Sequence, residues 1–201
     1  DPAETALFAA TIWAFYKSFE KTSWKWLLGS VIFFSLALGT KFNILFLPFI
    51  IIPYLIIRYW SNIKRPRTIK IPGKFWVVFL LSPLIVAIIF VGSWPMLWVN
   101  WPESILNVFG YYKEIGTAAN YQPAFFYLHG LNTFPALWIL FTTPPVTLGL
   151  FILGLISICF NLKPKNYVVL LWLFWLLIPI IRVSLPGTSI YGGVRQLMEY
   201  L

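Results

Sequence analysis

Residues 75–91 read FWVVFLLSPLIVAIIFV, a run without a single charged side chain. A helix needs about 20 predominantly apolar residues to cross the hydrocarbon core of a bilayer, and this run comes close to that length. The whole chain shares its character: 60% of residues are hydrophobic, 20% are aromatic and only 10% are charged. Soluble domains carry about 25% charged residues. With a mean hydropathy of +0.81, the composition predicts an integral membrane protein.

Similar apolar runs recur along the chain, bounded by Lys and Arg clusters and by Gly, Pro and Asn. They predict helices over Thr5–Phe19, Trp24–Leu38, Asn43–Tyr59, Phe75–Val91, Leu137–Phe160 and Tyr167–Ile181, with a seventh beginning near Val194. The predicted fold class is therefore an all-α polytopic transmembrane bundle of about six to seven spans. We expect one transmembrane domain over residues 1–201. Because the chain opens on Asp1 rather than Met, and ends soon after the last run begins, we expect both ends to be truncated.

The net charge of +9 is arranged for a membrane rather than for nucleic acid. If the predicted helices alternate in direction, 11 of the 15 basic residues fall on one side, and an excess of Lys and Arg marks the cytoplasmic side. We therefore expect no nucleic-acid partner. Cys159 and His129 are the only residues of their types, so neither a disulfide framework nor a Cys/His zinc site is expected.

The long connection from Ser93 to Ala136 falls on the external side in this scheme. It is rich in Trp, Tyr and Phe, which favours one or two short amphipathic helices lying along the membrane interface. Downstream, Thr142-Thr143-Pro144-Pro145 interrupts the next apolar run. Either the span begins at Pro144 or Pro145 with Thr143 as its cap, or one longer helix is kinked there.

A few polar residues near the external helix ends could carry chemistry. A carboxylate from Asp1 or Glu4 could act as a general base or hold a divalent cation, or could simply cap the first helix. Lys41 and Arg195 could bind phosphate, although both could also be snorkelling interfacial cations. The cofactor left open is a divalent cation, with Asp1 as its candidate ligand.

Aromatic residues in the external connection are the candidate substrate-lining groups. Trp94 and Trp98 could stack on a sugar ring or an isoprenoid chain, or belong to an ordinary aromatic belt. His129 could orient a substrate, although a lone His in such a loop is more often structural.

Five short motifs together resemble a known family. They are Asp1-Pro2 opening a helix, residues 38–43 (LGTKFN), Trp94-Pro95 with Trp98, Thr143-Pro144-Pro145, and residues 191–195 (YGGVR). They look like the core of GT-C membrane glycosyltransferases, and are most similar to glycosyltransferase family 39, which is related to protein mannosyltransferases and aminoarabinose transferases.

The resemblance implies a bacterial plasma-membrane enzyme that transfers a sugar from a polyprenyl-phosphate donor to a lipid or protein acceptor on the external face. It implies that Asp1 is an assisting catalytic acid and that Arg195 contacts the donor phosphate. We expect Lys41 to join Arg195 at that phosphate and Tyr191 to line the substrate site. The family's main base would lie upstream of Asp1. Gly192 and Gln196 stand where the family often has Asp and His, so no role is transferred to those two positions.

Two other classes of membrane protein compete with this interpretation. A transporter or flippase of lipid-linked sugars would also have many helices, but transporters place ionisable groups or broken helices near the bilayer midplane. The centres of the predicted spans contain no Asp, Glu, Lys, Arg or His. A membrane subunit with a purely structural role is the third alternative. The sequence thus favours a glycosyltransferase, with a transporter or flippase as the alternative.

Overall fold

The computed structural model describes residues 2–59, 72–100, 102–117, 126–161 and 167–186. The chain divides into two compact units. The first comprises residues 1–47 and 61–113, and the second comprises residues 48–60 and 114–201. Each unit is described by itself. The prediction of a single domain therefore stays a prediction.

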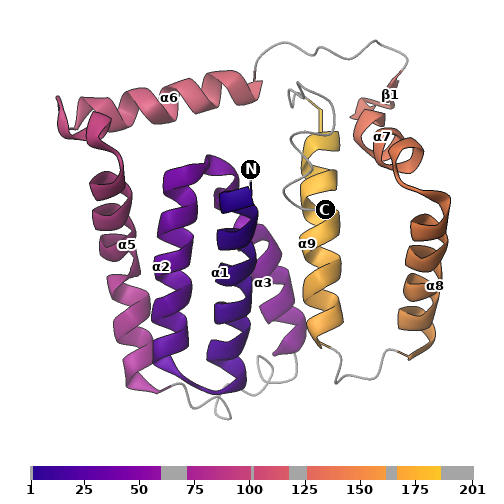
Figure 1. Cartoon of the computed structure of the whole chain (residues 1–201), viewed down its shortest axis with the longest axis horizontal. Helices are drawn as coiled ribbons and strands as arrows, with labels where there is room; N and C mark the ends of the chain where they lie inside the picture. The colour runs from indigo at the N-terminus through magenta and orange to yellow at the C-terminus, as the bar shows by residue number, and fades with distance from the viewer. Residues whose placement is uncertain (1, 60–71, 101, 118–125, 162–166, 187–201) are drawn as a thin grey trace. The chain divides into compact units, whose positions relative to one another are not determined.

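Helices α1, α2 and α5 build the first unit. They span Pro2–Glu20, Trp24–Thr40 and Gly73–Ser93, and α2 packs against both of the others. Figure 1 shows α2 between α1 and α5. The short 3-10 helix η1, Phe42–Phe46, follows α2, while η3, Pro95–Trp98, and the amphipathic α6, Glu103–Thr117, follow α5. The prediction of one or two short helices between residues 93 and 136 agrees with η3 and α6, and their position along a membrane interface stays a prediction.

Small polar side chains join α1 to α2. The hydroxyl of Ser30 donates to the carbonyl oxygen of Thr11 at 3.2 Å, and both residues are buried. Interhelical hydrogen bonds of this kind are common in membrane bundles, where water cannot compete for the donor. About one turn closer to the α1–α2 connection, the rings of Trp13 and Trp26 meet edge to face with centroids 4.8 Å apart.

The second unit contains α3, α7, α8, α9 and a hairpin. The helices span Leu47–Arg58, Phe134–Thr142, Pro145–Asn161 and Tyr167–Ser184, and strands β1, Tyr127–Leu128, and β2, Leu131–Asn132, pair antiparallel. An unbroken helix over Leu137–Phe160 is wrong, because α7 and α8 are separate and bent by 115°. The alternative, a helix that begins at Pro145, is confirmed. Pro144 disfavours helical backbone at Thr143, which adopts extended φ and ψ angles, so α8 begins at Pro145.

Of the helices that the structure describes, α5 is the one that is long and apolar enough to cross a membrane by itself. Only 17% of its most apolar window is buried, and Phe79, Leu80 and Ile88 are each more than 60% exposed. The core helix of a soluble protein would be mostly buried, so this exposure fits a helix whose solvent is lipid. The bent α7–α8 pair adds a second span if it is counted as one. The remaining apolar helices are shorter, and the count of six to seven spans stays a prediction.

Candidate functional site

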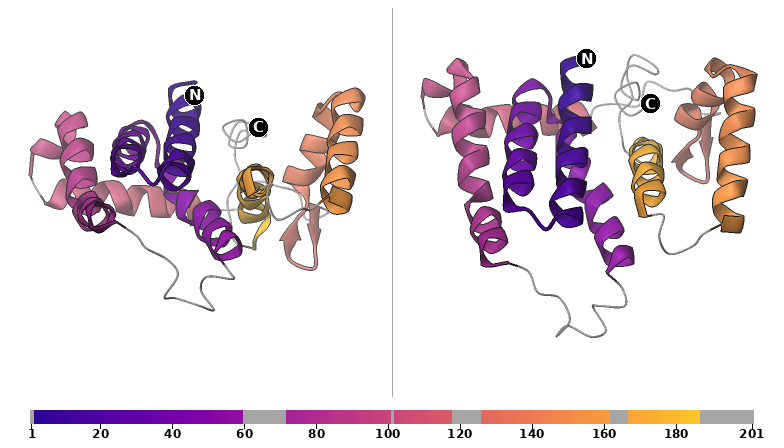
Figure 2. Two further views of the ribbon diagram at one scale, coloured as in Figure 1. Left: turned by 90° about the horizontal axis from the view of Figure 1, so that it is seen from below. Right: turned by 60° about the horizontal axis from the view of Figure 1, so that its bottom comes forward.

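In the first unit, the beginning of α1 and the ends of α2 and α5 lie at the same end, and α6 runs across it (Figures 1 and 2). This arrangement follows from the alternating direction of the three helices. It brings together Glu4 from the first turn of α1, Lys41 directly after α2 and Trp94 directly after α5. Three segments that are distant in sequence thus meet at one rim.

Glu4 and Lys41 form an ion pair at this rim. The Nζ atom of Lys41 lies 3.7 Å from Oε2 of Glu4, which is longer than a hydrogen bond. The Glu4 side chain is only 1% exposed and that of Lys41 is 33% exposed. Neither carboxylate oxygen accepts a hydrogen bond from a described group. Since a buried carboxylate is costly without a counter-charge, Lys41 stabilises Glu4 where it stands.

The ends of α2 and α5 approach closely at Gly39. A Cβ atom on this residue would lie only 2.7 Å from Oγ of Ser93. The approach allows the indole Nε1–H of Trp94 to donate to the carbonyl oxygen of Gly39 at 2.6 Å. The last carbonyls of a helix lack partners within the helix, so this hydrogen bond also caps α2. Gly39 and Trp94 together fix the backbone just before Lys41.

Phe42 lies at the centre of an aromatic cluster below this contact. Its ring meets those of Phe90, Trp94 and Phe109 edge to face, with centroids 5.4 to 6.1 Å apart. Such pairs contribute about 0.5–1.5 kcal/mol beyond the burial of their area. The cluster joins α5 and α6 to η1, so the segment that carries Lys41 is held on both sides.

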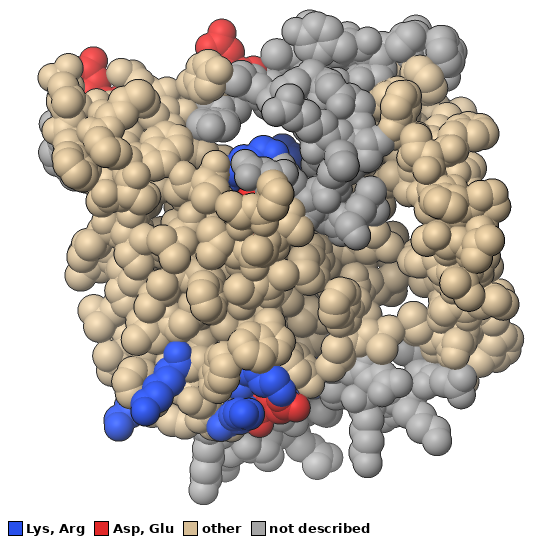
Figure 3. All heavy atoms as spheres, viewed as in Figure 1, with Lys and Arg blue, Asp and Glu red and all other residues tan. Residues whose placement is uncertain are grey.

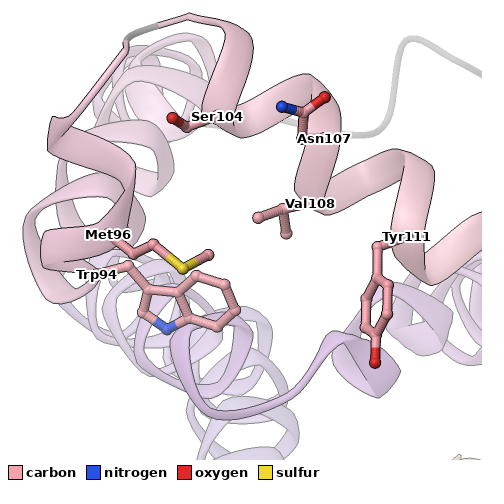
Figure 4. A pocket seen from close by; sticks show the side chains of 6 residues that line it. All are labelled: Trp94, Met96, Ser104, Asn107, Val108 and Tyr111. Atoms are coloured by element: carbon pink, nitrogen blue, oxygen red, sulfur yellow. The ribbon is translucent and has the colours of Figure 1, made fainter.

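A pocket of about 380 Å³ opens beside Trp94. In Figure 4, Trp94 and Met96 stand on one side, Tyr111 on the other, and Val108 projects between them. Ser104 and Asn107 complete the lining, and no charged side chain takes part. The pocket therefore offers aromatic faces and neutral polar groups. Met96, Ser104, Asn107, Val108 and Tyr111 were not predicted from the sequence.

Charged side chains separate toward the two ends of the first unit. Lys17, Lys21, Lys25 and Lys74 lie where α1 ends and α2 and α5 begin, opposite the rim that carries Glu4 and Lys41. In Figure 3, Lys and Arg side chains gather along the lower edge, and further basic side chains lie in the upper half of the view. Within the described part of this unit, the segregation agrees with the predicted alternation of basic connections.

The other predicted site residues do not line this pocket in the described structure. Trp98 is 61% exposed, and its indole N–H donates to the carbonyl oxygen of Val91 at 2.7 Å. His129 is exposed in the second unit, where it and Gly130 form the two-residue hairpin loop with φ of 51° and 85°. Paired positive φ values are typical of tight hairpin turns. Asp1, Tyr191 and Arg195 lie outside the described residues.

The described residues contain no group of three or more His, Cys, Asp or Glu side chains that could hold a metal ion. Asp1, the candidate ligand, lies outside them. The divalent cation thus stays a prediction.

Comparison with known proteins supports a class of membrane enzymes for the chain. Residues 1–89 match the family model described as dolichyl-phosphate-mannose-protein mannosyltransferase. This match supports a GT-C-type glycosyltransferase, and it covers Glu4, Gly39 and Lys41 but ends before Trp94 and the pocket. No curated protein and no solved structure matches the chain.

The Gly39 contact predicts a conditional effect of an added methyl group. We expect Gly39→Ala to lower the free energy of unfolding by about 1–2 kcal/mol, because the new Cβ displaces the Ser93 hydroxyl, which donates to the carbonyl of Phe90. In a Ser93→Ala background the nearest remaining atom is Cβ of residue 93 at 3.6 Å, so the same substitution should be tolerated. Thermal unfolding of the four proteins in detergent measures both effects. Equal losses in the two backgrounds would contradict the proposed contact.

Proposed function

We propose that the protein is a membrane glycosyltransferase that uses a polyprenyl-phosphate sugar as donor and a lipid or protein as acceptor. The observation that carries the proposal is the Glu4–Lys41 ion pair at the rim of the first unit, within the segment that matches the mannosyltransferase family. Ionisable residues at or in a membrane are costly and are functional candidates by default. The motifs favour glycosyltransferase family 39 within this class.

The reaction needs a base for the acceptor and positive charge for the departing carrier. The acceptor oxygen attacks the anomeric carbon of the sugar, and the bond from that carbon to the phosphate oxygen breaks. The electron pair of that bond stays on the polyprenyl phosphate, and the acceptor proton passes to a carboxylate. Lys41 and Arg195 stabilise the phosphate by charge, and Asp1 assists at the acceptor.

The aromatic residues are proposed to line the substrate site. Trp94 has its indole N–H engaged by Gly39, so its ring face is the part it offers to the pocket. Neutral polar side chains such as Asn107 can hydrogen-bond to sugar hydroxyls. Trp98, His129 and Tyr191 are proposed as further lining residues on the basis of the sequence motifs.

The working face is proposed to be external, in a bacterial plasma membrane. Support comes from the basic side chains of Lys17, Lys21, Lys25 and Lys74 at the end opposite Lys41, because positive residues mark the cytoplasmic side. A divalent cation is proposed as an optional cofactor, with Asp1 as its ligand. Membrane lipids are the remaining partners.

A transporter or flippase of lipid-linked sugars is the alternative function. Glu4 lies in the first turn of α1 and Lys41 directly follows α2, so this pair stands at helix ends. Transporters commonly bind their substrates near the bilayer midplane. The placement of the pair therefore favours the transferase.

Replacing Lys41 should reduce catalysis selectively. We expect Lys41→Met to lower kcat/KM for polyprenyl-phosphate mannose by about a hundredfold, because the ammonium that stabilises the negative charge of the departing phosphate is lost. Lys25→Met is the matched control, since Lys25 is exposed at the opposite end of α2 and should change kcat/KM by less than about twofold. Assays in reconstituted membranes, normalised to folded protein, measure both. Similar values for the two variants would refute the role of Lys41.

Asp1 and Arg195 are tested in the same assay. Asp1→Asn removes the assisting carboxylate and Arg195→Ala removes the guanidinium, and each should lower kcat/KM by about tenfold or more. Unchanged sugar transfer in both variants would reject the roles proposed for them.

A further inference from the structure

Glu4 occupies a place that is hard to explain by packing alone. It is a buried carboxylate, 0% exposed as a residue, and the residues on either side of it, Ala3 and Thr5, are small and uncharged. A helix-capping carboxylate would lie in water at the helix N-terminus, where the macrodipole favours it. Glu4 instead is turned inside, next to the ammonium of Lys41. Lys41 is therefore the described side chain with which Glu4 forms an ion pair.

The backbone of Lys41 is held, but its side chain is long. The amide of Lys41 donates to the carbonyl oxygen of Ala37 at 2.9 Å, and the preceding Gly39 is tied to Trp94. A lysine side chain has a flexible four-carbon stem, and a cation near a membrane interface tends to snorkel into the headgroups. The carboxylate of Glu4 restrains the free end of that stem.

We propose that Glu4 is a positioning residue that holds the Lys41 ammonium at the donor-phosphate site. This inference rests on the proposed function. An ammonium carries three N–H donors, so it can stay paired with a carboxylate while it binds a phosphate oxygen. Because Lys41 is 33% exposed and Glu4 only 1%, a ligand arriving from the exposed side meets Lys41 first.

Two effects of the Glu4 charge oppose one another. Its negative charge repels the donor phosphate, but it also keeps the ammonium in place before the donor arrives. The Glu4 carboxylate is less exposed than the Lys41 ammonium, so a bound phosphate would lie farther from the carboxylate than from the ammonium. Because Coulomb energy falls with separation, the repulsion is weaker than the attraction. Preorganisation removes the entropy cost of ordering a lysine side chain on binding. Positioning should therefore dominate, and removal of the charge should weaken donor binding.

The test measures kcat and donor KM separately for Glu4→Gln, with polyprenyl-phosphate mannose as the probe and the protein reconstituted in liposomes. We expect donor KM to rise about tenfold, with a smaller change in kcat. Glu4→Asp keeps the charge and should rescue part of the loss. Glu20→Gln is the matched control, because Glu20 is in the same helix and pairs with Lys17, with both side chains partly exposed. It should leave KM unchanged.

The same substitution in a Lys41→Met background separates this inference from the proposed function. If Glu4 acts through Lys41, Glu4→Gln should cause no further rise in donor KM there. An equal rise in both backgrounds would show a structural role only and overturn the inference. A KM for Glu4→Gln that is unchanged or lower, while Lys41→Met raises it, would overturn the inference and leave the proposed function standing.

If both kcat and donor KM are unchanged in Lys41→Met, the phosphate site itself is overturned and the inference with it. Thermal unfolding shows whether each variant folds. If Glu4→Gln does not fold, Glu4→Asp carries the test: a smaller rise in donor KM supports positioning, and an unchanged KM overturns it.

Discussion

The close approach of α2 and α5 at Gly39 is the constraint on which the rim of the first unit depends. A Cβ atom at this position would lie 2.7 Å from the Ser93 hydroxyl, which would have to shift. Their proximity lets Trp94 reach the carbonyl oxygen of Gly39 and bring its ring to Phe42. Lys41 lies between Gly39 and Phe42 in the sequence. Its backbone is consequently fixed from both sides, and its side chain meets Glu4 of α1.

The surroundings of the bundle determine which partners the buried Glu4 carboxylate can have. A bundle whose outer faces are apolar, as those of α5 are, excludes water from its lateral surface, so polar groups must find partners inside the protein. Ser30 and Thr11 do so by an interhelical hydrogen bond, and Glu4 does so through Lys41. The ionic groups of this unit stand near the helix ends, where a reaction at the membrane surface would take place. This placement is consistent with the class supported by residues 1–89.

Local sequence patterns predicted the helices well and the site less completely. The apolar runs located α1, α2, α5 and α9 to within a few residues, because long apolar stretches bounded by polar residues give an uninterrupted helix signal. The α7–α8 break was one of two alternatives, since a Pro pair permits a kink or a new start. His129-Gly130 could have indicated a hairpin, but a non-Gly residue with positive φ is uncommon enough that the pattern is weak.

The Glu4–Lys41 pair could not be derived from one sequence, because pairing between distant segments depends on helix packing. Each residue was a candidate separately. The pocket residues of α6 were missed for a different reason: Asn107, Val108 and Tyr111 carry no distinctive chemistry until a helix aligns them opposite Trp94.

The central claim is that the protein breaks the bond between sugar and carrier. The most direct measurement follows labelled polyprenyl-phosphate mannose in liposomes that contain the unaltered protein and membrane acceptors. We expect free polyprenyl phosphate to appear as labelled sugar is transferred. Donor that stays intact, whether it remains in place or merely changes leaflet, would contradict it.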